Sequence, residues 1–248
     1  MQAPIVEVTE PEAGIVQVRM HDRVNKNTFT NELIAGLTRA FEDIGSGNHK
    51  AVILTGYDSY FASGGTQEGL RDLYDGKFRF TDKDLYSLAL NCPIPVIAAM
   101  QGHGIGGGFV MGLFADFVVL ARESVYTANF MKYGFTPGMG STFILPQKLG
   151  ISLAEEMMLT AATYRGEELQ RRGVPFPVLP RDGVLAHALE IARNLAEKPR
   201  VSLATLKAHL VAPLREQLPR FIDQEIAMHE LTFHRPEVRD RIDALFGM

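Results

Sequence analysis

The chain has 248 residues, of which 46% are hydrophobic and 22% charged, with a formal net charge of −4. These values suit one large domain, or a domain with a small appendage, built around a continuous core. The mixed charge gives no sign of nucleic-acid binding, and no apolar run is long enough to span a membrane. The N-terminal segment does not resemble a signal peptide, and the single Cys92 excludes an internal disulfide framework. Together these features predict a soluble cytoplasmic protein.

The first third of the chain predicts a β-hairpin, a helix and a buried strand. Apolar residues alternate over residues 5–8 and 15–20, on either side of turn-forming residues, as in a hairpin. Apolar side chains recur at helical spacing over residues 31–44. The apolar run of residues 51–55 ends at a glycine and is typical of a buried strand.

Strands and helices continue to alternate towards the middle of the chain, and helices follow. Residues 81–91 predict a helix, and residues 95–100 and 117–121 predict buried strands. The later helices are expected over residues 153–159, 167–172, 185–195, 203–210 and 221–233. This order predicts an α/β core with a C-terminal helical appendage.

A glycine cluster, QGHGIGGGF at residues 101–109, follows the strand of residues 95–100 directly. Taken alone, it satisfies the G-x-G-x-x-G pattern of dinucleotide-binding proteins. The acidic residue expected about 20 positions later is missing, because Asp116 comes too soon. So many glycines instead indicate a backbone that comes very close to a ligand, or a tight turn from strand to helix.

Four motifs in order resemble those of the crotonase (enoyl-CoA hydratase/isomerase) superfamily. They are FASGGT at 61–66, QGHGIGGGF at 101–109, AD at 115–116 and YGFTPGMG at 133–140. The resemblance covers roughly residues 5–246. It implies a crotonase-type spiral core of ββα units in residues 1–195 and a C-terminal helical trimerisation region in residues 196–248.

The resemblance also implies an oxyanion hole for a thioester carbonyl. Carried over position by position, its two donors are the backbone N–H groups of Gly65 and Gly107. Such donors stabilise the negative charge of an enolate as it forms. A helix that starts near Gly107 adds its dipole in the favourable sense.

Both glutamates that handle water in the family's hydratases are replaced by apolar residues. The two positions correspond to Val110 and Phe130. Without a carboxylate there, no side chain is placed to activate water, so hydration is not expected. A further departure is Thr66, where the family usually has aspartate.

An apolar pocket beside an oxyanion hole suits decarboxylation, because the hole can hold the enolate or dienolate that remains. The segments GGTQEGL, MQGHGIGGGFVMGLFAD and ANFMKYGFTPGMG resemble the decarboxylases of polyketide β-branching cassettes. That resemblance implies a 3-methylglutaconyl group held on the phosphopantetheine of an acyl carrier protein. It further implies a 3-methylcrotonyl-type thioester as product, no separate cofactor, and acyl carrier protein as partner.

The subgroup resemblance suggests a catalytic lysine in the loop after the oxyanion turn. Lys77 is the best match, with Arg79 and Lys83 as reserves, and Tyr74 is a candidate hydrogen-bonding neighbour in the pocket. A solvated surface lysine is the alternative interpretation of Lys77.

Among the seven histidines, His229 lies on the apolar stripe of its helix. A core histidine is the usual interpretation of such a position, but the subgroup places a catalytic histidine here, so His229 is predicted to donate a proton to the dienolate. His103 is predicted to brace the backbone, and His234 to lie at the surface. The His and Cys positions show no metal-ligand spacing.

Three other functions fit parts of the sequence. One is another enolate reaction, such as double-bond isomerisation on CoA. The second is a non-catalytic crotonase-fold binding protein, although such a protein has little reason to keep both glycine turns. The third is a dinucleotide-dependent dehydrogenase.

Overall fold

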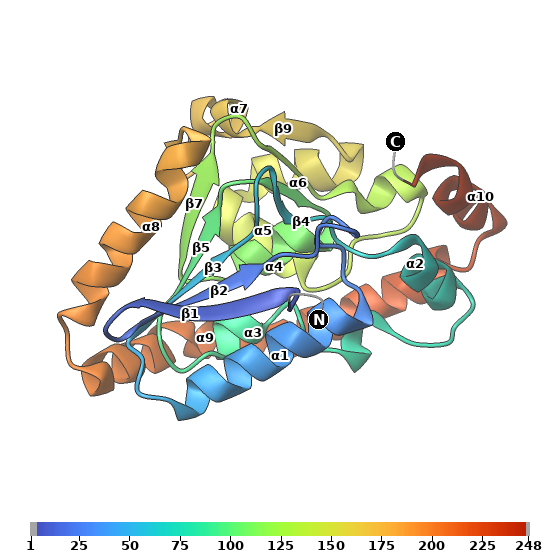
Figure 1. Cartoon of the computed structure of the whole chain (residues 1–248). Coiled ribbons are helices and arrows are strands. Elements are labelled where there is room, and N and C mark those ends of the chain that lie inside the picture. The colour runs from blue at the N-terminus through green and yellow to red at the C-terminus, as the bar shows by residue number, and fades with distance from the viewer. Residues whose placement is uncertain (1–3, 247–248) are drawn as a thin grey trace.

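The computed structural model describes residues 4–246 of the chain. Its larger sheet has six strands in the order β1-β2-β3-β5-β7-β10 (Figure 1). The first pair is antiparallel and the remaining neighbours are parallel. The strands are β1 (Val6–Glu12), β2 (Ile15–Met20), β3 (Ala51–Thr55), β5 (Val96–Met100), β7 (Phe117–Ala121) and β10 (Val178–Leu179). The predicted hairpin and the three predicted buried strands are therefore confirmed.

A second sheet is built from short strands, three of which directly follow a strand of the first. Its order is β4-β6-β8-β9, with bounds Tyr60–Ala62, His103–Ile105, Val125–Thr127 and Thr163–Arg165. The chain passes from β3 to β4, from β5 to β6 and from β7 to β8, and a helix follows each pair. This repetition is the predicted spiral of ββα units. Three-residue strands are too short to show a period, which is why the sequence did not reveal them.

Helices cover both faces of the large sheet. On one face α8 (Arg181–Ala196) packs Val184, Ala188 and Ala192 against the sheet. The side chains of the two alanines are small, so the helix lies close to the strands. On the other face lies the larger core, which includes α1 (Asn31–Ser46), α4 (Gly107–Leu113) and α5 (Ser141–Leu149).

The C-terminal region contains one long helix where two were predicted. Helix α9 (Arg200–Thr232) continues through Pro213 and Pro219. Proline removes a backbone hydrogen bond and usually breaks a helix. Here buried side chains on both sides of the prolines, including Val211 and Ile222, hold the helix against the core. The packing of α9 thus overrides the local preference.

The last helix packs against a helix from the first third of the chain. Helix α10 (Pro236–Leu245) lies beside α2 (Gln67–Tyr74) at the right of Figure 1. Arg71 Nε donates to Asp243 Oδ1 at 2.7 Å, and Gln67 Nε2 donates to the Ile242 carbonyl. The C-terminal helix is therefore joined to the helix that directly follows the glycine turn of residues 61–66.

The helix predicted for residues 81–91 is wrong in its extent. A 3-10 turn (η1, Phe80–Asp82) and a single helical turn (α3, Leu88–Asn91) replace it. Asp82 accepts a hydrogen bond from the Arg79 N–H, and Asp84 accepts one from the Ser87 hydroxyl. Short polar side chains that bond locally compete with a continuous helix.

The remaining helical elements are η2 (Asn129–Tyr133), α6 (Ile151–Thr160) and α7 (Gly166–Arg171). Among residues 4–246 no helix is both long and apolar enough to cross a membrane.

Candidate active site

The two glycine turns meet because the strands before them pair. Strands β4 and β6 are parallel, with Ala62 opposite Gly104. Gly64 has φ +75° and Gly106 has φ +53°, a left-handed region that favours glycine. A Cβ atom on Gly64 would lie 2.8 Å from the Ile105 carbonyl oxygen. Glycine is thus required for the first turn to contact the second.

Two backbone donors at these turns are unpaired. Within residues 4–246, neither the Gly65 nor the Gly107 N–H has a protein acceptor. Gly107 begins α4, and a Cβ atom on Gly64 would lie 3.3 Å from the Gly107 nitrogen, so the donors belong to one site. Two adjacent unpaired N–H groups are what an oxyanion requires. Thr66 caps α2 by accepting from the Gly69 N–H at 2.9 Å, a task that aspartate also performs.

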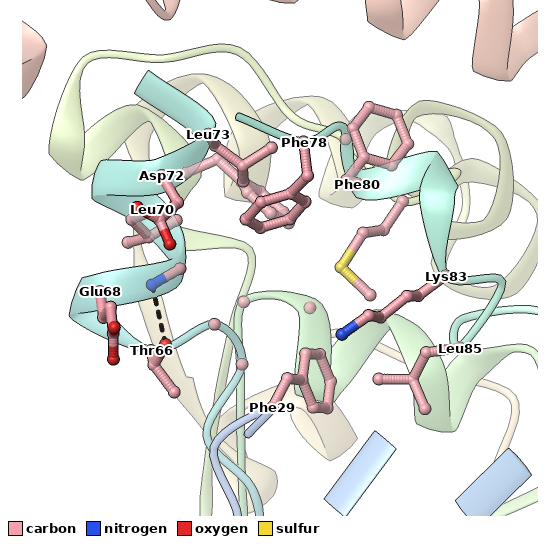
Figure 2. Close-up of a pocket in the computed structure, with 18 of the residues that line it drawn as sticks. Phe29, Thr66, Glu68, Leu70, Asp72, Leu73, Phe78, Phe80, Lys83 and Leu85 are labelled. Carbon is pink, nitrogen blue, oxygen red and sulfur yellow. Dashed lines mark hydrogen bonds between the residues drawn. The ribbon is translucent and has the colours of Figure 1, made fainter. Parts of the chain in front are cut away.

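A cavity of about 560 Å³ opens at these donors, a size that suits an acyl chain. Its wall is mainly aromatic and aliphatic, and Figure 2 shows part of it. The apolar lining residues are Phe29, Ile34, Leu70, Leu73, Phe78, Phe80, Leu85, Ile105, Phe130, Tyr133, Phe135, Met139, Phe233 and Phe246. A thioester carbonyl at the donors would therefore have a largely apolar environment for its acyl chain.

The cavity contains some of the predicted site residues and not others. Gly65, Gly107, Phe130 and His229 line it. Val110 is fully buried inside α4 and lies behind the wall. Val110 was expected to belong to the pocket, and the structure places it in the core behind the residues that line this cavity.

Tyr74 and Lys77 also lie outside the lining of this cavity. The Tyr74 ring packs against His234 and the Arg239 guanidinium, on the side of α10. The Lys77 side chain is 60% exposed, and its ammonium pairs with Asp72 at 2.6 Å and with Asp75 at 3.3 Å. These two carboxylates raise the pKa of Lys77. The loop carries Lys77 outwards, so the structure gives no support to its predicted catalytic role.

Two other cations from the same loop do line the cavity. They are Arg79 and Lys83, the predicted reserves. In Figure 2 the Lys83 side chain extends towards the cavity near Phe29, and its ammonium donates to the Asn31 side-chain oxygen. Arg79 has a distant ion pair with Glu230, at 3.8 Å. Lys83 has a neutral partner and Arg79 a loose one, so both can accept an anionic group.

Four carboxylates line the cavity, those of Glu32, Glu68, Asp72 and Asp82, and two of them are engaged by other groups. Asp72 lines the cavity but pairs with Lys77, and Asp82 accepts from the Arg79 N–H at 2.8 Å. Lys77 thus has a structural role that sequence reasoning missed, which is to neutralise Asp72 beside the site.

His229 lies in the aromatic end of the cavity. Its Nε2 is 2.8 Å from the Thr136 carbonyl oxygen, so this nitrogen carries the hydrogen. The ring contacts Phe80 and Phe233, with centroids 5.1 and 5.2 Å apart. Burial lowers the pKa of His229 to about 4. The free protein at neutral pH therefore holds an uncharged imidazole here.

The other two histidines are placed as predicted. His103 Nδ1 accepts from the Val125 N–H at 3.0 Å and so braces the backbone between the two strands. The His234 side chain is 44% exposed. Sequence reasoning missed Phe29 and Tyr133 in the cavity wall. Only tertiary packing brings Phe29 there, whereas Tyr133 and Met139 both lie in the motif at residues 133–140 and could have been identified.

The enoyl-CoA hydratase/isomerase family matches residues 10–246 of this chain. The chain belongs to this family. Bacillaene synthase decarboxylase PksI of Bacillus subtilis (strain 168) is 66% identical over 248 residues, which are 100% of both chains. Carnitinyl-CoA dehydratase of Salmonella enteritidis is 30% identical over 77% of this chain and 66% of its own. Of these two relatives, the decarboxylase is much the more similar to this chain.

Solved crotonase structures give the same result. A structure from work on "a dehydratase/decarboxylase enzyme couple involved in polyketide beta-branching" has a TM-score of 0.98 and 66% identity, covering 98% of this chain and 100% of that one. The ECH2 decarboxylase domain of CurF from Lyngbya majuscula has a TM-score of 0.94 and 45% identity, with the same coverage. The chain is therefore a crotonase-fold decarboxylase, as the sequence predicted, and not a dinucleotide-dependent dehydrogenase.

Proposed function

We propose that this decarboxylase removes CO2 from a 3-methylglutaconyl-type group on the phosphopantetheine of an acyl carrier protein. The product is a 3-methylcrotonyl-type thioester for polyketide β-branching. One observation carries the proposal: the unpaired N–H groups of Gly65 and Gly107 open onto an apolar cavity. Apolar side chains occupy both positions where the family's hydratases have glutamate.

The chemistry follows from this arrangement. As the C–CO2 bond breaks, its electron pair moves into the unsaturated thioester and gives a dienolate. The two N–H donors stabilise the developing charge on the thioester oxygen as it forms. Loss of a donor in comparable sites costs on the order of 10²–10³ in rate. The reaction then needs one proton at carbon, so that R–CO2⁻ and H⁺ give R–H and CO2.

In this proposal Arg79 and Lys83 hold the departing carboxylate, in place of Lys77. Both line the cavity, and neither is neutralised by a buried carboxylate. Their useful action is placement of the C–CO2 bond in line with the π-system, because a tighter grip on the carboxylate would only stabilise the ground state.

His229 supplies the proton once the substrate is bound. The free enzyme holds it neutral through burial. A substrate carboxylate in the same cavity favours the imidazolium and raises the pKa, since opposite charges nearby stabilise each other. The proton is thus taken up with the substrate and passes to the dienolate after CO2 leaves.

The assembly that we propose is a cytoplasmic homotrimer in which the C-terminal region, residues 196–248, makes the subunit contacts. Large apolar side chains on α9 support it, because several are strongly exposed in the single chain. They are Val201 (74%), Leu206 (57%), Leu210 (64%) and Leu231 (70%). Acyl carrier protein is the partner that delivers the substrate.

The test compares CO2 release from the 3-methylglutaconyl group on acyl carrier protein with release from the same group on CoA. We expect turnover with the carrier-bound thioester and a lower kcat/KM with the CoA thioester. Equal kcat/KM values for the two would remove the carrier from the proposal. Absence of CO2 release from both would overturn the decarboxylation of this acyl group.

A further inference from the structure

The turn at residues 137–140 has an unusual backbone. Met139 has φ +62° and Gly140 has φ +74°, so two consecutive residues are left-handed. This conformation is uncommon for a non-glycine residue and persists where the surroundings enforce it. Helix α5 begins immediately afterwards, and its N-cap, Gly140, has no side chain to accept from the first turn.

A carboxylate from another helix fills this need. Glu225 of α9 is 0% exposed. Its Oε2 accepts from the Gly140 N–H at 2.7 Å, and its Oε1 accepts from the Thr142 N–H at 2.8 Å and from the Thr142 hydroxyl at 2.7 Å. Burial raises the pKa of Glu225 to about 7, against the opposing effect of these donors. The three bonds fix the exit of the turn from a position 83 to 85 residues away in sequence.

The same turn contacts both parts of the site. His229, one helical turn after Glu225 on α9, is held by the Thr136 carbonyl just before the turn. A Cβ atom on Gly138 would lie 2.8 Å from His229 Cε1. At the other end, Met139 Sδ lies 2.5 Å from where a Cβ on Gly107 would stand. A shift of the turn would therefore move two groups together. They are the Thr136 carbonyl, which holds His229, and Met139, which packs beside the Gly107 N–H.

We infer that Glu225 is a positioning residue for the decarboxylation. From α9 it binds the turn where the turn enters α5, and this contact sets the positions of His229 and Met139 relative to the Gly107 donor. This inference rests on the proposed function. It differs from a simple helix-capping role, because a cap affects stability alone, whereas a clamp that aligns two catalytic groups also affects turnover.

The experiment compares Glu225→Ala with Asp116→Asn as a matched control. Asp116 is a partly buried carboxylate that accepts from the Val96 N–H and from Lys207, and none of these residues lines the cavity. Thr142→Val is a milder third variant that keeps Glu225 and removes one of its three donors. Melting temperature, kcat and KM are measured for each below its unfolding transition.

We expect Glu225→Ala to lower kcat by about 10–10²-fold, with KM changed by less than about threefold, since small misplacements cost this much. Thr142→Val should lower kcat several-fold. Asp116→Asn should lose stability but keep kcat within about twofold. An equal kcat in Glu225→Ala and wild type would overturn the inference. A fall in the kcat of Asp116→Asn in proportion to its loss of stability would also overturn it, since kcat would then follow stability alone. If Glu225→Ala does not fold, an unchanged kcat in Thr142→Val overturns it equally.

A readout that does not depend on turnover separates this inference from the proposed function. Nitrogen-15 NMR of His229 reports its titration, which is set by burial and by the Thr136 carbonyl, with Glu230 and His234 as the charged neighbours. In Glu225→Ala the midpoint should rise from about 4 towards the ordinary 6.5. An unchanged midpoint would contradict the clamp. A raised midpoint in a chain without decarboxylase activity would support the clamp and contradict the proposed function.

Discussion

A methyl group added at position 107 would collide with the cavity wall, whereas one added at position 65 would not. A Cβ on Gly107 would lie 2.5 Å from Met139 Sδ and 3.0 Å from Phe29, but on Gly65 the nearest atom, of Leu70, is 3.5 Å away. Gly107→Ala should therefore displace the cavity wall and reduce kcat by about 10–10²-fold. Gly65→Ala keeps its N–H donor and should stay within a few-fold of wild type. Steady-state CO2 release measures both, and similar values for the two variants would contradict this packing.

The basic residues of the loop give a second contrast at the same scale. Arg79→Ala and Lys83→Ala remove cations that line the cavity, so each should slow CO2 release by about 10–10²-fold through lost alignment. Lys77→Ala removes an exposed cation and should change kcat by less than about threefold. Single-turnover measurements with carrier-bound substrate test all three. A large effect of Lys77→Ala with none in the other two would restore Lys77 as the catalytic cation.

Helix α9 carries two buried ionisable groups, Glu225 and His229, whose contributions to stability change with pH in opposite directions. Burial raises the pKa of Glu225 to about 7, from an ordinary 4.5. Its contribution to stability is full below pH 4.5 and is lost as pH rises through 7. Burial lowers the pKa of His229 to about 4, from 6.5, so its contribution is full above pH 6.5 and is lost as pH falls through 4. Between about pH 4.5 and 6.5 the two largely cancel.

Removing one of the two groups should reveal the pH dependence that the other contributes to the free energy of unfolding. In His229→Gln the free energy of unfolding should fall by about 2 kcal/mol more than in wild type from pH 5 to 7.5. In Glu225→Gln it should instead rise over pH 4.5–7. Urea unfolding at a series of pH values tests this. Parallel pH profiles for the two variants would show that these residues do not carry the expected shifts.

Much of the element pattern follows from local sequence, but the cavity does not. Alternating or continuous apolar runs predict β2, β3, β5 and β7, because each is long enough to show its period. The glycine turns and the replaced glutamates could also be found in sequence. Helix α9 continues through its prolines because its buried side chains pack against distant segments. Lys77 lies outside the cavity, where its ammonium forms ion pairs. Those contacts leave no local pattern to read.

On the scale of the molecule, the exposed apolar side chains of α9 predict assembly. Sedimentation at micromolar concentration should show a trimer. Leu206→Glu combined with Leu210→Glu should shift the protein towards monomers, since it places charges on a surface that we expect to be buried between subunits. Val24 is 80% exposed and lies outside the C-terminal region, so Val24→Glu is the control and should leave the trimer intact. A stable wild-type monomer would contradict the trimer.

The central claim is that this crotonase site removes CO2 and adds a proton, without adding water. The most direct measurement is mass spectrometry of 3-methylglutaconyl-loaded acyl carrier protein after incubation with the enzyme in D2O. We predict that the acyl group loses one CO2 and that the product carries one solvent-derived deuterium at carbon. A product that has kept its carboxylate and gained water would contradict the account, since it would show that the site activates water without its two glutamates.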